Sequence, residues 1–194
     1  MAASSREHGA LVLCVLLAAG CTTGRGEGDV VGQVWAPDCN LIAEPVDLKP
    51  NFFAMQPSRS AEIINIVVQR GSDLVSFSDG INVFIRDPAL IKESMLGTDI
   101  EFQALASPVE MTLYLNARCT GYARTPVAYA AVSGTIRFDQ LFVPWMENET
   151  KETIAVFSNV LLVDNKDPEQ RRAVLDGDFQ FLFKAGLPAQ YFQY

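Results

Sequence analysis

The chain has 194 residues and a mass of 21.3 kDa, and its 49% hydrophobic and 20% charged residues are typical of a globular protein with a sizeable core. Its 15 basic and 23 acidic residues give a formal net charge of −8. This balance argues against a nucleic-acid-binding protein, because contact with the phosphate backbone needs clustered lysine and arginine side chains.

The first residues have the pattern of an export signal. A short polar stretch containing Arg6 precedes the apolar run Ala10 to Ala19. As a helix this run would span about 15 Å, half the hydrocarbon thickness of a membrane, which is typical of a signal peptide. The run ends in Leu17-Ala18-Ala19-Gly20-Cys21. This segment resembles the lipobox of bacterial lipoproteins, in which a cysteine is acylated and becomes the first residue of the mature protein.

The resemblance implies a signal peptide at residues 1–20 and lipidation of Cys21, although Ala18 stands where leucine is commonest in the family. An ordinary secreted protein cleaved nearby is the alternative. The residue after the cysteine is Thr22 rather than aspartate, which the resemblance associates with the outer membrane. The small and polar residues that follow predict a flexible tether over 21–29 and a folded domain over 30–194.

Cleavage before Cys21 would leave the mature chain without histidine, because the single histidine is His8. This excludes Ser-His-Asp and Cys-His catalysis and zinc sites that need histidine. Cys14 would also be removed and Cys21 acylated, so that Cys39 and Cys119 remain as the free pair. In an oxidising envelope we expect these two to form a disulfide, since they lack the CxxC spacing of redox or metal-binding thiols.

Alternation of apolar and polar residues dominates the rest of the chain. It predicts strands around residues 64–68, 81–85, 111–115, 132–138, 154–162 and 175–183, with further candidates at 30–35, 74–77 and 100–103. The segments 154–162 and 175–183 are expected to pair across the polar loop between them. We predict an all-β fold, an antiparallel β-sandwich. An outer-membrane barrel, suggested by the aromatic residues at 191–194, is a weaker alternative because the loops carry proline and charge on both sides.

Helical signals are few. Asp87-Pro88 has the pattern of an N-cap followed by proline at the first helical position, and residues 89–96 before Gly97 predict two helical turns. Asp167-Pro168 opens a second short helix. Both segments are too brief to form a layer, so the sandwich is expected to carry one or two short helices.

Three groups of residues are candidates for sites. The acidic residues Asp164, Asp167, Asp176 and Asp178 could supply oxygen ligands to Ca²⁺, but no EF-hand pattern is present and solvated turns are the simpler interpretation. The rings of Trp35, Phe52, Phe53 and Trp145 lie near expected turns and could stack on sugars or anchor a protein partner, although core packing is the simpler interpretation. The pair Arg171-Arg172 is most simply a solvated loop pair.

The layout from Cys21 through residues 47–53 to 186–190 resembles uncharacterised lipoproteins of myxobacterial type, which implies no activity. We expect a membrane-anchored envelope lipoprotein that acts as a structural or protein-interaction module, without catalytic, cofactor-binding or metal-binding residues. Its expected partners are the lipid membrane and envelope proteins.

A glycan- or Ca²⁺-binding lipoprotein is the alternative, and would show a concave aromatic or acidic pocket instead of a flat apolar patch. A histidine-independent glycosidase is third, and needs two carboxyl groups about 5 to 9.5 Å apart.

Overall fold

The computed structural model describes residues 26–71, 74–102, 107–119 and 127–183. Within these ranges the prediction of an all-β fold is confirmed, because the chain forms one antiparallel sheet of ten strands with short helical elements. The strands are β1 (Gly26–Ala36), β2 (Leu41–Leu48), β3 (Phe52–Ser58), β4 (Ile63–Gly71), β5 (Ser78–Ile85), β6 (Ile100–Glu101), β7 (Val109–Leu115), β8 (Ala128–Gln140), β9 (Glu152–Val163) and β10 (Arg172–Leu182). The helical elements are η1 (Pro37–Cys39), η2 (Val75–Phe77), α1 (Pro88–Leu90) and the π-helical η3 (Ile91–Met95).

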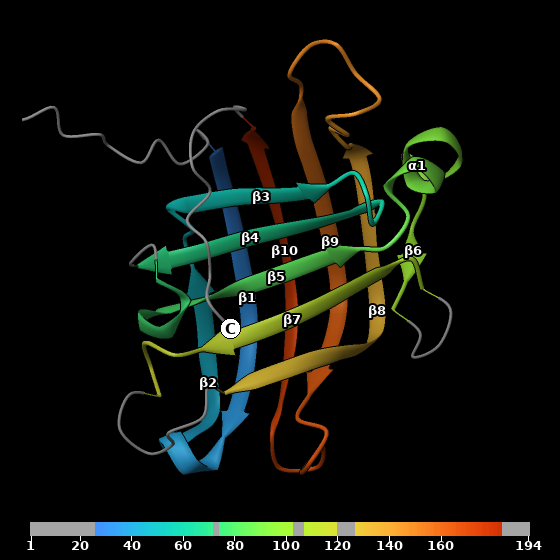
Figure 1. The fold of residues 1–194 in the computed structure, drawn as a ribbon. Coiled ribbons are helices and arrows are strands. Elements are labelled where there is room, and N and C mark those ends of the chain that lie inside the picture. The colour runs from blue at the N-terminus through green and yellow to red at the C-terminus, as the bar shows by residue number, and fades with distance from the viewer. Residues whose placement is uncertain (1–25, 72–73, 103–106, 120–126, 184–194) are drawn as a thin grey trace, which may run out of the picture.

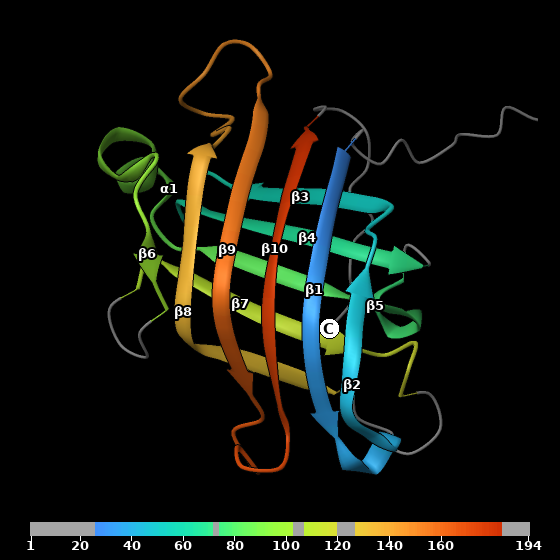
Figure 2. The same cartoon turned by 180° about the vertical axis from the view of Figure 1, so that it is seen from behind.

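The sheet folds over on itself to make a sandwich of two layers. Its order is β2-β1-β10-β9-β8-β7-β5-β4-β3, with β6 beside β8. Strands β3, β4, β5 and β7 form one layer, and they cross the strands of the other layer, β2, β1, β10, β9 and β8 (Figure 1, Figure 2). Crossed layers of this kind are joined by strands that bend from one layer into the other.

Strand β8 makes this corner. Its first residues pair with β7, whereas most of its length pairs with β9 through three register shifts. Gly134 lies in the irregular part with a φ of 98°, and a Cβ there would lie 2.5 Å from the carbonyl oxygen of Asn159. Only glycine accommodates both the left-handed backbone and the close approach of β9.

The core fills the space between the layers. It is built from the alternating apolar positions that predicted the strands, and its largest fully buried side chains include Tyr129, Phe138, Phe157, Phe179 and Phe181. The rings of Phe53 and Phe181 stack with 5.9 Å between their centroids, which packs β3 of one layer against β10 of the other. The expected pairing of the last two strands is also confirmed, with Leu175 opposite Val160.

The folded domain begins earlier than predicted. Strand β1 starts at Gly26 rather than at Val30, so residues 26–29 belong to the sheet and not to a tether. Gly26 lies opposite Phe181, and Gly28 lies opposite Phe179. A Cβ on Gly26 would lie 2.6 Å from the Cβ of Phe181. The glycines are therefore needed where β1 packs closely on the phenylalanines of β10, and they do not indicate a linker here.

Other boundaries also differ from the predictions. Residues 75–77 form the 3₁₀ turn η2 instead of a strand, and residues 168–170 form a turn instead of a helix. Strands β2 and β3 are not among the predicted strands, and each contains a proline. They lie at the two edges of the sheet, where Pro45 and Pro57 are tolerated because an edge strand need not donate every backbone hydrogen bond.

The first short helix is confirmed. The carboxylate of Asp87 accepts a hydrogen bond of 2.9 Å from the backbone N–H of Leu90, and Pro88 occupies the first helical turn. The segment ends at Gly97, whose φ is 71°. None of the described helices is long and apolar enough to cross a membrane.

Candidate functional site

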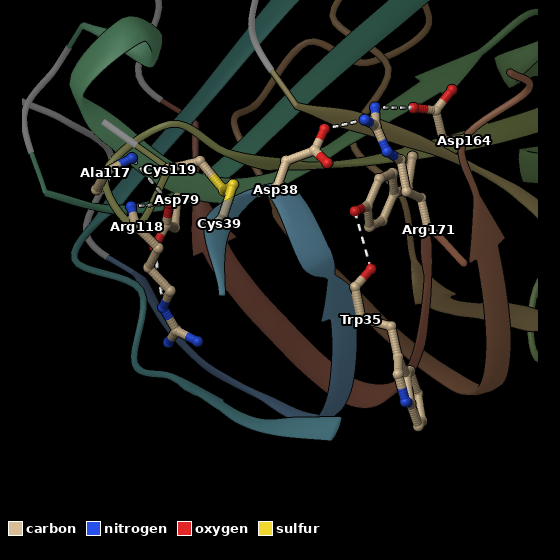
Figure 3. The surroundings of a disulfide bond; sticks show 10 residues. Trp35, Asp38, Cys39, Asp79, Ala117, Arg118, Cys119, Asp164 and Arg171 are labelled. Atoms are coloured by element: carbon tan, nitrogen blue, oxygen red, sulfur yellow. Dashed lines mark hydrogen bonds and ion pairs between the residues drawn. A yellow bond between two sulfur atoms is a disulfide. The ribbon is translucent and has the colours of Figure 1, made fainter. Parts of the chain in front are cut away.

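The cysteines predicted to pair do form a disulfide (Figure 3). Cys39 ends η1 and Cys119 follows β7, and their Cα atoms lie 5.3 Å apart across a sequence separation of 80 residues. Because η1 connects β1 to β2 in one layer and β7 belongs to the other layer, the bond links the two layers. It does so at the end of the sandwich opposite the start of β1.

An ion pair between Asp79 and Arg118 lies beside Cys119, the cysteine that follows β7 (Figure 3). Asp79 Oδ1 accepts hydrogen bonds from the backbone N–H groups of Ala117 at 3.0 Å and Arg118 at 3.3 Å, and Arg118 Nε lies 3.1 Å from Asp79 Oδ2. Arg118 also donates to the carbonyl oxygen of Pro45 in β2. Burial raises the pKa of Asp79, although these hydrogen bonds act to lower it.

The two consecutive arginines are half-buried and make specific contacts. Arg171 forms ion pairs with Asp38, next to Cys39, and with Asp164 at 3.1 Å (Figure 3). The guanidinium of Arg172 lies 4.9 Å from the ring centroid of Trp35. Both arginines therefore fix the β9–β10 hairpin to the end of β1.

The four acidic residues considered for Ca²⁺ do not converge. Asp164 and Asp167 lie in the β9–β10 hairpin, where they accept hydrogen bonds from the backbone N–H groups of Lys166 and Gln170. Asp176 accepts one from Asn159 at 2.8 Å. In the described ranges no three aspartate, glutamate, cysteine or histidine side chains are grouped so that they could hold a metal ion.

The aromatic residues near turns are mostly part of the core. Phe52 is 7% exposed and Phe53 is 2% exposed, and Trp145 packs partly buried against the core. Trp35 is half-buried on the outer side of β1, against Arg172. These rings therefore follow the simpler interpretation, and they do not form a shared exposed platform.

The outer side of the layer containing β1 carries an apolar surface. Val31, Val132 and Val174 are exposed to 41%, 38% and 36%, and they come from β1, β8 and β10. Val174 pairs in register with Leu161 of β9, and Val163 follows two residues later on the same side. We call Val31, Val132, Leu161, Val163 and Val174 the apolar face.

Several acidic residues lie close together beside the apolar face. Asp178 of β10 lies opposite Asp29 of β1. The ammonium group of Lys49 lies 2.5 Å from Asp29 and 3.4 Å from Asp47. Burial, Asp29 and Glu27 together raise the pKa of Asp178. This edge of the apolar face therefore carries a net negative charge.

The opposite layer has a hollow of about 440 Å³ on its outer side, with both polar and apolar lining residues. It is lined by Gln56, Pro57, Ser58, Ile63, Asn65, Asn82, Phe84, Glu110 and Thr112, and we call it the amide hollow. Its sole carboxylate among the described lining residues is Glu110, which forms an ion pair with Arg86. The lining therefore does not supply the pair of carboxyl groups that a glycosidase needs.

The predicted signal peptide and the predicted lipidation site Cys21 lie outside the described residues. Comparisons with protein-family models, with curated proteins and with solved structures found no match to this chain.

Proposed function

We propose that this chain is a bacterial envelope lipoprotein, acylated at Cys21, whose sandwich binds a protein partner through the apolar face and has no catalytic activity of its own. The observation that carries the proposal is the exposure of three valines on one sheet face, two on the neighbouring strands β1 and β10 and one on β8, with β9 between β10 and β8. Apolar side chains gathered on a solvent-facing sheet surface are typical of interaction sites.

The position of the proposed anchor determines which end of the domain would lie near the membrane. Strand β1 begins at Gly26, five residues after Cys21. Five residues extend no further than about 17 Å, so the end of the sandwich where β1 begins and β10 ends would stay close to the bilayer. The disulfide lies at the opposite end of β1, so it would face away from the membrane. Strands β1, β10, β9 and β8, which carry the residues of the apolar face, run between these ends (Figure 2).

Charge beside the apolar face restricts the kind of partner. Asp29, Asp176 and Asp178 lie on β1 and β10 next to Val31 and Val174. A partner with an apolar centre and basic residues at the edge that meets these aspartates would complement this arrangement, because complementary charge at the rim favours association and rejects acidic surfaces. We therefore expect the bound protein to present lysine or arginine beside aliphatic side chains.

In-cell crosslinking tests this proposal. Tagged wild-type protein is compared with Cys21→Ser, Val174→Lys and the matched control Ile42→Lys, which changes an exposed aliphatic residue outside the apolar face (Ile42 is 73% exposed). We expect one protein species to be captured by the wild type and by Ile42→Lys, and to be lost with Val174→Lys. Cys21→Ser is expected to leave the membrane fraction. Equal capture by all variants, or capture of no protein, would contradict the proposal.

A further inference from the structure

The amide hollow is built by register across four strands of the layer opposite the apolar face. Gln56 of β3 pairs with Asn65 of β4, Asn65 pairs with Phe84 of β5, and Phe84 pairs with Glu110 of β7. Strands lie about 4.8 Å apart, so this row of four side chains spans about 14 Å. The volume of about 440 Å³ lies within the range of small-molecule sites. The hollow therefore has the size for an extended ligand rather than for a single ion.

The lining offers hydrogen-bonding groups that both donate and accept. Asn65 and Asn82 carry a carbonyl oxygen and an amide nitrogen each, and Thr112, opposite Asn82, carries a hydroxyl group. The Oδ1 atom of Asn65 is buried and has no hydrogen-bond partner within the described part of the chain. A buried acceptor without a donor is costly, and a ligand hydroxyl group placed there would remove that cost.

The remaining lining residues restrict the class of ligand. Phe84 is half-buried in the middle of the row and offers part of an aromatic ring, on which an apolar ring face can pack. Glu110 disfavours an anionic ligand, and its ion pair with Arg86 reduces its attraction for a cation. A ligand that fits these groups is uncharged, rich in hydroxyl groups and has apolar C–H surfaces.

We infer that the amide hollow binds a neutral oligosaccharide. Amide side chains bond its hydroxyl groups, and Phe84 packs against one sugar ring. The hollow is lined by residues of β3, β4, β5 and β7, and the apolar face is formed by residues of β1, β8, β9 and β10. These two sets of strands belong to different layers (Figure 1, Figure 2). Glycan binding is therefore independent of the protein contact proposed above, and both sites can be occupied together.

Isothermal titration calorimetry on the full chain, purified in a zwitterionic detergent without sugar groups, tests the inference. The probes are cellohexaose, xylohexaose, mannohexaose and N-acetylchitohexaose, with polygalacturonate as an acidic polymer. The variants are Asn82→Ala and Phe84→Leu, of which the second keeps apolar volume but removes the ring. Gln33→Ala is the matched control, because Gln33 is an exposed amide residue on the outer side of β1. Circular dichroism verifies that each variant is folded.

We expect at least one neutral hexasaccharide to bind, and both hollow variants to bind it about tenfold or more weakly, which corresponds to about 1.4 kcal/mol. Gln33→Ala is expected to bind as the wild type does. The inference is overturned if none of the four neutral probes binds, if polygalacturonate binds more tightly than all of them, or if the hollow variants keep wild-type affinity.

Discussion

Arg171 pairs with Asp38, although the two residues are 133 positions apart in the sequence. Asp38 is the neighbour of Cys39, so the short segment between β1 and β2 is held on one side by the disulfide and on the other by this ion pair (Figure 3). Three distant parts of the chain therefore meet at the end of the sandwich that we expect to face away from the membrane.

The disulfide is expected to contribute far more stability than the ion pair. Closing a loop of 80 residues stabilises a fold by about 4.5 kcal/mol in the chain-entropy model. An exposed ion pair contributes about 0.2–1 kcal/mol. We expect the Cys39→Ala, Cys119→Ala double variant to lose about 2–5 kcal/mol of unfolding free energy in urea denaturation. Asp38→Ala, which removes only the ion pair with Arg171, is expected to lose no more than about 1 kcal/mol. Reduction of the wild type should reproduce the first loss. Equal stability of oxidised and reduced protein would contradict this ranking.

The glycines at the start of β1 are expected to be needed for packing. A Cβ on Gly28 would lie 2.7 Å from the carbonyl oxygen of Asp178, and one on Gly26 would meet Phe181. Overpacking of this kind costs about 1–3 kcal/mol, and we expect each alanine substitution to lower the free energy of unfolding by that amount. Gln33→Ala, at an exposed position further along β1, is the control. If the glycine variants were as stable as this control, residues 26–29 would be acting as a tether after all.

Asp178 gives a pH-dependent prediction. Its pKa in the folded protein lies above the ordinary value, because of burial and the charges of Asp29 and Glu27. The folded state therefore binds this proton more tightly than the unfolded state, and ionisation of Asp178 destabilises the fold at neutral pH. We expect Asp178→Asn to be more stable than the wild type at pH 7.

The advantage of Asp178→Asn should disappear as the pH falls below the ordinary carboxyl value of 3.8, because Asp178 is then protonated in both states. Urea denaturation at several pH values measures this difference. Glu44→Gln, which removes an exposed charge on β2 away from the cluster, serves as the comparison. A constant difference between Asp178→Asn and the wild type at all pH values would show that charge repulsion is not the cause.

Glu147 joins the loop after β8 to the η3 helix. Its carboxylate lies 2.9 Å from Lys92 Nζ and 3.0 Å from Lys151 Nζ, and accepts a hydrogen bond from the backbone N–H of Val143. Burial alone would raise the pKa of Glu147, but these partners lower it below the ordinary value. Ionised Glu147 therefore stabilises the fold above the ordinary value of 4.5, and this contribution is lost as the pH falls through the lowered value.

We expect Glu147→Gln to lower the free energy of unfolding by about 1–3 kcal/mol at pH 7, because Lys92 loses its charged partner. The effect should shrink in acid. Glu149→Gln changes an exposed residue of the same loop and is expected to leave stability unchanged. A Glu147→Gln variant as stable as Glu149→Gln would argue that this loop is held by its buried apolar residues alone.

Local periodicity was enough to predict most of the sheet. Strands β4, β5, β7, β9 and β10 have apolar residues at alternate positions, and this pattern depends only on which face of a strand is buried. Strands β2 and β3 were missed because Pro45 and Pro57 interrupt the pattern, and edge positions tolerate proline for a reason that is invisible before the strand order is known. The tether was misjudged because composition cannot distinguish a flexible glycine from one packed against phenylalanine.

The candidate sites were harder to predict than the strands. The disulfide could be predicted because Cys39 and Cys119 are the two cysteines that remain once Cys14 is assigned to the signal peptide and Cys21 to the lipid anchor. This prediction needed no knowledge of the fold. The amide hollow depends on register, since Gln56, Asn65 and Phe84 come together only when β3, β4 and β5 pair as they do. The available signal for the hollow was the polar residues at outward-facing positions of the predicted strands. The sequence of one strand does not show which polar residues of the other strands lie beside it.

Intact mass spectrometry of the protein extracted from membranes tests the central claim most directly. Anchoring at Cys21 predicts a chain of residues 21–194 whose N-terminal cysteine carries a diacylglyceryl modification, and predicts that Cys21→Ser is released from the membrane fraction. A mature chain that begins at another residue and carries no lipid would contradict the account of this protein as a membrane-anchored binding module.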